Sequence, residues 1–371
     1  MTAIDRLDVD VYRIPTDKPE ADGTFAWDAT TMVVARPATV DAEGIGYTYT
    51  TSAAAELIAD LLAAVIVGSD PMDVPTIWTR MVAAIRNVGR PGVASAAIAA
   101  VDIGLWDLKA KLLGLPLVTL LGAARPAVPV YGSGGFTSYT EAELCDQLAN
   151  WVQQDGIGRV KMKIGTDCGA REKQDVARVQ AARSAIGDDA ELFVDANGAY
   201  DAKQAIRLAG AFREADVRWF EEPVSSDDLA GLRTVREQTD IEIAAGEYGA
   251  DLAYFQRMCG ARAVDVVQAD VTRCAGITEW QRIAALAAAH GLDISGHCAP
   301  TAHLAVACSV PNLRHLEYFH DHVRIESMVF DGARGARDGA LTPDLDRAGL
   351  GIALRPDAAQ YRTDETEGTQ R

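Results

Sequence analysis

Along the first third of the chain, hydrophobic and polar positions follow first the period of strands and then the period of helices. Helical spacing dominates from residue 53 to residue 113 and ends at a glycine and a proline. Before it, three segments look like strands: residues 4–14, which alternate with a period of two, and residues 30–38 and 43–51. A small sheet followed by helices predicts a separate α+β module, which we assign to residues 1–126.

Between the first two predicted strands, residues 16–29 are polar and are interrupted by Pro19 and Gly23. Proline and glycine in a polar stretch are typical of loops, so we predict a loop here. Its end carries two aromatic residues, Phe25 and Trp27.

Beyond residue 127 the pattern changes to short apolar strands that alternate with amphipathic helices. Eight strands and their helices over about two hundred residues predict a TIM-type barrel, which we assign to residues 127–330. The predicted strands are residues 128–134, 159–165, 191–198, 217–223, 241–247, 264–270, 292–297 and 315–320. No good helix is recognisable after the eighth strand. We expect residues 331–371 to be an irregular segment that packs back on the first module, with a frayed tail at 363–371.

Polar residues stand where a barrel enzyme needs them. Every predicted strand from the second to the eighth carries an ionisable side chain at or near its end. These positions are Lys161, Lys163, Asp195, Asn197 (polar but not ionisable), Glu221, Glu222, Glu247, Asp270, His297 and Glu317. Because active sites in this fold lie at the C-terminal face, we expect these side chains to converge on one cavity.

Three of the carboxylates have equal spacing. Asp195 and Glu221 are 26 residues apart (221 − 195), and so are Glu221 and Glu247 (247 − 221). They should therefore come from adjacent strands at equivalent depth and repel one another unless a cation lies between them. An all-oxygen ligand set selects a hard cation, so we expect Mg²⁺, with Mn²⁺ able to substitute. The alternative is that these acids form salt bridges with lysines of neighbouring strands.

The remaining strand-end residues are candidates for acid–base chemistry. Lys161 and Lys163 point to the same face and should depress each other's pKa, which suits Lys163 to removing a proton. Asp270 should fix the tautomer of His297, on the neighbouring strand, across the cavity from the lysines. Glu317 in an acidic, partly dry site could stay protonated and donate a hydrogen bond to a carboxylate.

The composition narrows the range of partners. A formal net charge of −18 argues against nucleic acid and anionic membranes. The charged N-terminal segment predicts no secretory signal, and no apolar run approaches the roughly 18 residues that span a bilayer. Six scattered cysteines without paired spacing indicate reduced thiols. We therefore expect a cytoplasmic protein that acts on a small molecule.

Several motifs together resemble one family. The segments are KMKIG, VDANGAY, WFEEP, AAGE, VQADVTRCAGIT, SGH and HLEYF, together with the helix at 96–122 and the closing LDRAGLGIAL. They resemble the enolase superfamily, specifically its mandelate racemase subgroup, over nearly the whole chain. The resemblance implies a modified (β/α)7β barrel with an α+β capping domain, and a homo-oligomer.

The resemblance also implies roles for these residues. Asp195, Glu221 and Glu247 would bind Mg²⁺. Lys163, with Lys161 beside it, would be one acid/base, and His297 with Asp270 the other. Glu317 would assist as an electrophile, and the cap segments 16–30 and 46–51 would set specificity. We expect substrate contacts at Asn197, Phe25, Trp27, His320, Asp321, His322 and Arg324.

The segment after Glu317 departs from several family members. Its residues His320 to Arg324 would either contact substrate or link the eighth strand to the cap. The pair His320 and His322 also suggests a zinc site. Metal-dependent amidohydrolases, however, carry such a pair on strand one, and the first predicted barrel strand has no histidine.

The predicted reaction begins with loss of the α-proton of a carboxylate substrate to Lys163 or His297, giving an enediolate stabilised by the metal and Glu317. Proton return from the other face gives racemisation or epimerisation, whereas loss of a β-hydroxyl gives dehydration. The polar cap segment favours a sugar-acid dehydratase over a racemase. A metal-free retaining glycosidase and a non-catalytic binding protein are the alternatives from other classes. The first would stay active in EDTA, and the second would be expected to lack some of these acids or bases.

Overall fold

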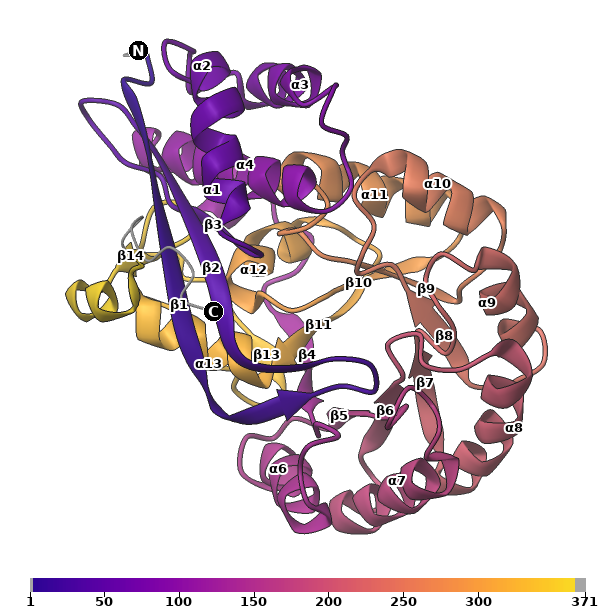
Figure 1. The fold of residues 1–371 in the computed structure, drawn as a ribbon. Helices are drawn as coiled ribbons and strands as arrows, with labels where there is room; N and C mark the ends of the chain where they lie inside the picture. The colour runs from indigo at the N-terminus through magenta and orange to yellow at the C-terminus, as the bar shows by residue number, and fades with distance from the viewer. Residues whose placement is uncertain (1–2, 364–371) are drawn as a thin grey trace, which may run out of the picture.

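An antiparallel three-stranded sheet and five helices form the N-terminal part of the structure, a computed structural model that describes residues 3–363 (Figure 1). The strands are β1 (Arg6–Ala21), β2 (Ala26–Ala38) and β3 (Gly46–Tyr49). The helices are α1 (Ala53–Leu57), which continues through a π-type turn (Ile58–Leu62) into α2 (Ala63–Ile66), then α3 (Val74–Ala84), α4 (Val93–Leu112) and α5 (Leu117–Leu121).

Helix α4 connects the sheet of this capping module to the barrel. It is buried along most of its length and crosses β3 so closely that a Cβ on Gly46 would lie 2.1 Å from the carbonyl oxygen of Ala100. Glycine is therefore required at this crossing. On the barrel side, buried Asp102 accepts hydrogen bonds from the backbone N–H and hydroxyl of Thr278.

The loop predicted for residues 16–29 is wrong, because β1 and β2 form a long hairpin whose turn is confined to residues 22–25. The register shifts between the pair Pro15–Ala29 and the pair Glu20–Trp27, so β1 carries extra residues at this point. A bulge of this kind accommodates Pro19 without ending the strand. Proline and glycine in a polar stretch had indicated a loop, whereas they mark a bulge and a turn.

Eight parallel strands close into a barrel in the order of the sequence, and β11 pairs with β4. The predicted barrel with a capping module is therefore confirmed. The strands are β4 (Val128–Gly134), β5 (Arg159–Lys163), β6 (Glu191–Asp195), β7 (Val217–Glu221), β8 (Glu242–Ala245), β9 (Val266–Ala269), β10 (Asp293–Gly296) and β11 (Leu313–Phe319). The helices between them are α6 (Glu141–Gln153), α7 (Glu172–Ile186), α8 (Ala202–Phe212), α9 (Leu229–Arg236), α10 (Leu252–Gly260), α11 (Ile277–Ala289) and α12 (Pro300–Ser309).

Aromatic side chains fill the barrel interior beneath the strand ends. Tyr131, Phe193 and Trp219 pack on one another with ring centroids 5.5–6.2 Å apart, and His315 packs against all three. Burial lowers the pKa of His315 well below its usual value, so its ring is neutral. This layer forms an apolar floor for the charged groups above it.

The expectation that no helix follows the eighth strand is also wrong, because α13 (His320–Val329) begins directly after β11. Its inward positions repeat with helical spacing, but several of them are polar: Asp321, His322 and Glu326 are buried beside Ile325 and Val329. A hydrophobic pattern cannot reveal a helix whose buried face is polar. The helix lies against the β1–β2 hairpin of the cap (Figure 1).

The C-terminal segment contains three short strands, β12 (Phe330–Asp331), β13 (Ala340–Leu341) and β14 (Ala353–Leu354), and a 3₁₀ helix (Pro356–Tyr361). It returns to the cap, where the backbone N–H of Leu350 donates to Asp107 at 2.6 Å and that of Thr363 donates to Val11 at 2.9 Å. Apart from Thr363, the tail predicted to be frayed lies outside the described residues.

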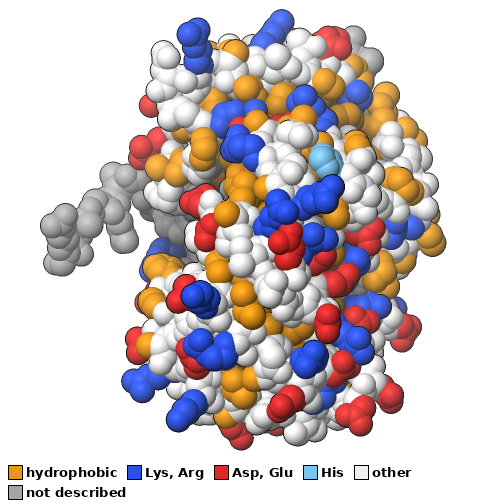
Figure 2. All heavy atoms as spheres, turned by 90° about the vertical axis from the view of Figure 1, so that its right-hand side faces the viewer, with side chains coloured by type: hydrophobic (Ala, Val, Ile, Leu, Met, Phe, Trp, Pro, Cys, Tyr) orange, Lys and Arg blue, Asp and Glu red, His pale blue; other side chains and the backbone are white. Residues whose placement is uncertain are grey.

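On the face formed by α8, α9 and α10, acidic and basic side chains are interspersed, so neither sign of charge dominates (Figure 2). Apolar side chains are scattered over the same face. No helix in the described part of the chain combines the length and apolar character needed to cross a membrane.

The hairpin tip provides a first prediction. A Cβ on Gly23 would lie 2.5 Å from the carbonyl oxygen of Gly165 and 2.6 Å from that of Ile164, and neither backbone atom can yield like a flexible side chain. We expect Gly23→Ala to displace the tip, to break the hydrogen bond from Cys168 N–H to the Gly23 carbonyl, and to lower the free energy of unfolding by about 1–3 kcal/mol.

Urea denaturation measures this loss, and chymotrypsin reports the displacement through faster cleavage after Phe25 or Trp27. Gly158→Ala is the matched control, since nothing lies within 4 Å of a Cβ there. Equal stability and equal cleavage of the two variants would show that the tip is not held by this contact.

Candidate active site

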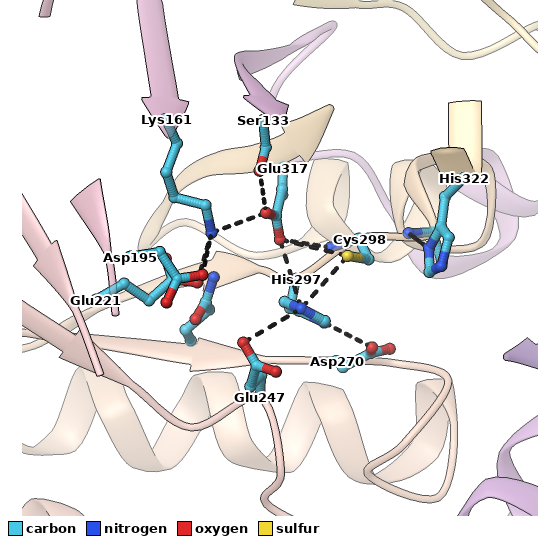
Figure 3. A network of polar contacts seen from close by, with 12 residues as sticks. Ser133, Lys161, Asp195, Glu221, Glu247, Asp270, His297, Cys298, Glu317 and His322 are labelled. Carbon is cyan, nitrogen blue, oxygen red and sulfur yellow. Dashed lines mark hydrogen bonds and ion pairs between the residues drawn. The ribbon is translucent and has the colours of Figure 1, made fainter. Parts of the chain in front are cut away.

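The structure brings the predicted strand-end residues together at the C-terminal face of the barrel (Figure 3). Asp195 and Glu221 are the last residues of β6 and β7 and lie directly opposite each other in register. Glu247 follows β8, and one oxygen from each of the three carboxylates lies within 4.8 Å of the others. All three side chains are buried. The equal spacing along the sequence thus corresponds to equal depth in the barrel.

The triad was predicted either to bind a cation or to form salt bridges with lysines of neighbouring strands. Salt bridges are present, because the lysines of β5 pair with its carboxylates. Lys161 forms ion pairs with Glu221 and, at 3.5 Å, with Asp195, and Lys163 pairs with Asp195. Lys161 also lies 2.8 Å from Glu317. Its ammonium group is 5.3 Å from the ring centroid of Tyr131, so the aromatic floor supports it from below.

The predicted effect of one lysine on the other is present, but the carboxylates around them reverse the net shift in pKa. Burial and the charge of Lys161 act to lower the pKa of Lys163, but the attraction of Asp195 and then Glu247 outweighs both and raises it. The pKa of Lys161 is raised well above its usual value, because Glu221 and Glu317 outweigh its burial. Two neighbouring cations matter less here than the carboxylates around them.

Negative charge nevertheless exceeds positive charge in the cluster. Three permanent cations, Lys161, Lys163 and Arg273, face six carboxylates: Asp195, Glu221, Glu222, Glu247, Asp270 and Glu317. The surplus appears in the pKa of Glu221, which burial and then the charge of Asp195 raise to about 8. Burial and the charge of Glu247 raise the pKa of Glu222 well above its usual value.

These residues fit a divalent cation. Oδ1 of Asn197 is enclosed without a hydrogen-bond partner. Oε2 of Glu247 also accepts no hydrogen bond, although it lies 3.3 Å from Nε2 of His297. Both oxygens are good cation ligands. Asn197 is held with a positive φ of 45° while its N–H donates to Asp195, which strains the backbone next to the triad. A hard cation between the carboxylates would offset the surplus negative charge that the lysines leave.

His297 and Asp270 form the predicted pair. The imidazole Nδ1 lies 2.8 Å from Oδ2 of Asp270, whose other oxygen accepts from the N–H and hydroxyl of Thr272. This contact places the Nδ1 proton toward Asp270 and leaves Nε2 directed at Glu247, 3.3 Å away (Figure 3). Burial acts to lower the pKa of His297, but the charges of Glu247 and Glu317, together with the hydrogen bond to Asp270, outweigh it and raise the pKa.

The expectation that Glu317 stays protonated is wrong. Burial acts to raise its pKa, but Lys161, then His297, hold it well below its usual value. The carboxylate also accepts hydrogen bonds from the Ser133 hydroxyl at 2.6 Å and from the Cys298 backbone N–H at 3.1 Å. Donors from three separate strand ends therefore keep Glu317 ionised.

Two residues in the site were not predicted. Cys298 directly follows His297, and the side chains of adjacent residues normally point in different directions. Its positive φ of 51°, with that of Ala299 at 40°, turns the thiol back toward Nε2 of His297, 3.3 Å away. Arg273 donates to Glu247 at 3.1 Å and lies 3.5 Å from Asp270. Arg273 could have been recognised in the sequence from its position three residues after Asp270.

Three residues predicted to contact substrate lie at the junction between α13 and the cap hairpin. Nε2 of His320 is 3.0 Å from Oδ2 of Asp17. Asp321 accepts a hydrogen bond of 2.6 Å from the Thr30 hydroxyl and pairs with Arg324, which also donates to the carbonyl oxygen of Pro15. These contacts correspond to the alternative in which this segment links the eighth strand to the cap.

His322, by contrast, faces the site from α13 (Figure 3). Its ring stacks on Tyr49 of β3 with centroids 3.5 Å apart, and its Nδ1 accepts a hydrogen bond from the Ala299 N–H. Burial lowers its pKa to about 3, so the ring is neutral and Nε2 carries the proton.

The aromatic pair of the hairpin lies close to the β4 end of the barrel. The ring of Trp27 meets that of Phe136 edge-on at 5.7 Å, and Phe25 stacks on Trp27 from the exposed side. The indole N–H of Trp27 donates to Glu20, whose pKa is raised to about 8 by burial and then by the charge of Asp321.

A capped barrel whose strand ends combine three buried carboxylates, two lysines, an Asp–His pair and a further glutamate defines an enzyme of the enolase superfamily. Sequence comparison agrees. Residues 143–358 match the family described as enolase C-terminal domain-like, and residues 21–122 match the mandelate racemase / muconate lactonizing enzyme N-terminal domain. The chain belongs to this family.

Relatives with known names or structures extend the comparison. L-talarate/galactarate dehydratase of Salmonella typhimurium is 35% identical over 86% of this chain and 79% of its own length. A mandelate racemase/muconate lactonizing enzyme-like protein from Rubrobacter xylanophilus is 49% identical, with a TM-score of 0.94 over 97% of this chain and 100% of its own. A racemase from Streptomyces coelicolor with bound magnesium is 32% identical, with a TM-score of 0.90 over the same shares.

The buried ion pairs of Lys161 provide a second prediction. Lys161→Met keeps the length of the side chain but removes the charge that three carboxylates share. We expect the free energy of unfolding in EDTA to fall by about 3–5 kcal/mol, because Glu221 is left buried without a cationic partner and Asp195 and Glu317 each lose one.

Urea denaturation in EDTA measures this cost, and added Mg²⁺ should restore part of the lost stability, since a ligand of the folded state stabilises it. Lys173→Met, on the exposed face of α7, is the matched control and should change stability by less than about 0.5 kcal/mol. A cost for Lys161→Met as small as the control would contradict the charge balance described above.

Proposed function

We propose that this chain is a Mg²⁺-dependent enzyme that removes the α-proton of a small carboxylate substrate, and that its reaction is the dehydration of a sugar acid. The observation that carries the proposal is a buried carboxylate triad with a lysine pair on one side and an Asp–His pair on the other. A named dehydratase relative and a magnesium-bound structural neighbour support it.

Asp195, Glu221 and Glu247 would hold the ion. Bound Mg²⁺ would attract the substrate carboxylate, stabilise the negative charge that develops on it and lower the pKa of Lys163 by offsetting the carboxylates around that residue. Lys161, already buried against Glu317, supplies a second fixed positive charge at the same place.

The two acid–base groups lie on different sides of the triad. Lys163 ends β5, whereas His297 follows β10, three strands away around the barrel through β4 and β11. Lys163 would remove the α-proton. His297, whose raised pKa favours the protonated ring, would donate a proton to the departing β-hydroxyl. Asp270 orients His297 for this transfer, and Glu317 positions Lys161 and His297.

Substrate contacts would come from the cap side of the site. His322 offers an Nε2–H donor from a neutral ring that Tyr49 holds in place. Trp27, whose ring meets Phe136, and Phe25 present aromatic faces on the hairpin, which suit the carbon skeleton of a sugar acid. Asn197, next to the triad, would be a further substrate contact.

Racemisation or epimerisation of an α-hydroxy acid is the second candidate. One observation favours it, since acid–base groups on two sides of the triad also permit proton return to the opposite face, and a neighbour is titled a racemase. The dehydratase relative leads us to place dehydration first.

A panel of sugar acids with Mg²⁺ tests the reaction. We expect a 2-keto-3-deoxy acid from at least one aldonate or aldarate, loss of the activity in EDTA, and its return with Mg²⁺, because the triad alone repels the substrate carboxylate. Keto acid detection after semicarbazide treatment measures dehydration, and NMR in D₂O measures α-proton exchange. Exchange without keto acid from any substrate would assign racemisation, and full activity in EDTA would contradict the metal.

Substitution of the two acid–base groups tests the mechanism on the substrate that the panel identifies. We expect Lys163→Ala and His297→Asn each to lower kcat at least about a hundredfold, the usual contribution of a positioned acid or base. Lys173→Ala and His290→Asn, both on exposed surface, are the matched controls. Unchanged kcat in both active-site variants would rule out the assigned roles.

A further inference from the structure

A second group of metal-ligand side chains lies at the junction of the cap hairpin and α13, separate from the triad. Asp17 and Glu20 come from β1, and His320 is the first residue of α13. One ligand atom of each lies within 4.8 Å of the other two. The residues come from positions about three hundred apart in the sequence, so only the docking of the cap brings them together.

Glu20 carries the observation that points to a ligand. Its side chain is fully enclosed, with 0% exposed. Oε2 accepts the indole N–H of Trp27 at 2.9 Å, but Oε1 has no hydrogen-bond partner. An enclosed carboxylate oxygen without a partner is unfavourable, and a cation between the three side chains would satisfy it.

The basic side chains nearby are engaged elsewhere. Lys18 pairs with Glu143 at 2.8 Å. Arg324 pairs with Asp321 and donates to the Pro15 carbonyl at 2.6 Å. Within residues 3–363, neither forms an ion pair with Asp17 or Glu20, so no lysine or arginine is paired with these two carboxyl groups.

The geometry points to a metal site, and we propose that Asp17, Glu20 and His320 bind a first-row divalent transition-metal ion. One imidazole nitrogen and two carboxylate oxygens are a ligand set that such ions accept, whereas the all-oxygen triad suits Mg²⁺. Nε2 of His320 lies 3.0 Å from Oδ2 of Asp17, close to the roughly 3.4 Å between two ligands of a tetrahedral ion.

This ion would fasten the cap to the barrel. Two of its ligands belong to the hairpin, and the third stands three residues after Glu317, on the helix that continues β11. Binding would therefore hold the hairpin against the strand that carries an active-site carboxylate. The site goes beyond the proposed reaction and does not depend on it.

Metal analysis of the full chain tests the site with Co²⁺ as the probe. The protein is dialysed against millimolar Mg²⁺, which keeps the triad supplied, and micromolar Co²⁺. We expect one bound Co²⁺ per chain by elemental analysis, with a visible absorption band. Asp17→Asn and His320→Gln should bind Co²⁺ at least about tenfold more weakly, while their Mg²⁺ content stays unchanged. His290→Gln, which removes an exposed histidine elsewhere, should bind Co²⁺ like the wild type.

The location is tested with Glu247→Gln, which impairs the triad but not the junction. Retention of the Co²⁺ equivalent in this variant supports the proposal, and its loss would place the Co²⁺ in the triad and overturn it. Absence of bound Co²⁺ from the wild type, or wild-type affinity in His320→Gln, would overturn it as well. Because Asp17 is exposed, Asp17→Asn keeps the test informative even if a variant at enclosed Glu20 does not fold.

Discussion

Repulsion among buried carboxylates is the constraint on which the rest of the active site depends. Parallel strands in register place Asp195 beside Glu221, and Glu247 follows on the next strand. Two such charges about 4 Å apart repel by roughly 4 kcal/mol at the effective dielectric constant typical of proteins. The lysine pair of β5 offsets part of this repulsion, so Lys161 and Lys163 stabilise the fold before they take part in any chemistry.

The same charge balance determines what each ionisable group can do. The carboxylates that hold Lys163 protonated are those that a divalent cation would neutralise, so the basicity of Lys163 and the occupation of the triad are linked. Glu317 shows the converse effect, because its cationic neighbours and hydrogen-bond donors keep it ionised although it is buried. In this site the protonation state of a residue is a property of the cluster and does not follow from burial alone.

The sequence allowed the barrel, the triad and the Asp270–His297 pair to be predicted, because strand period and the position of a residue at a strand end are local properties. The features that were missed depend on distant residues. Helix α13 has a polar buried face whose partners lie on β2, on β3 and at the start of α12. The ionisation of Glu317 depends first on Lys161, from the second barrel strand, and then on His297. Cys298 enters the site through a left-handed backbone conformation that residue type does not indicate.

The tip of the β1–β2 hairpin borders this site, since Gly23 packs against Ile164 and Gly165, directly after Lys163. Lys163 and His297 are only 5% and 4% exposed, so little of either side chain reaches the solvent. The tip is bonded to the barrel by backbone hydrogen bonds from the Thr137 N–H to Ala21 and from the Cys168 N–H to Gly23, and by the Thr137 hydroxyl, which donates to the Asp22 carbonyl. Each such bond contributes about 0.5–1.5 kcal/mol, so opening the tip costs far less than unfolding the cap, whose helix α4 is buried along the barrel. The members of the charged cluster all lie on the barrel strands or shortly after them, so their mutual contacts do not depend on the hairpin.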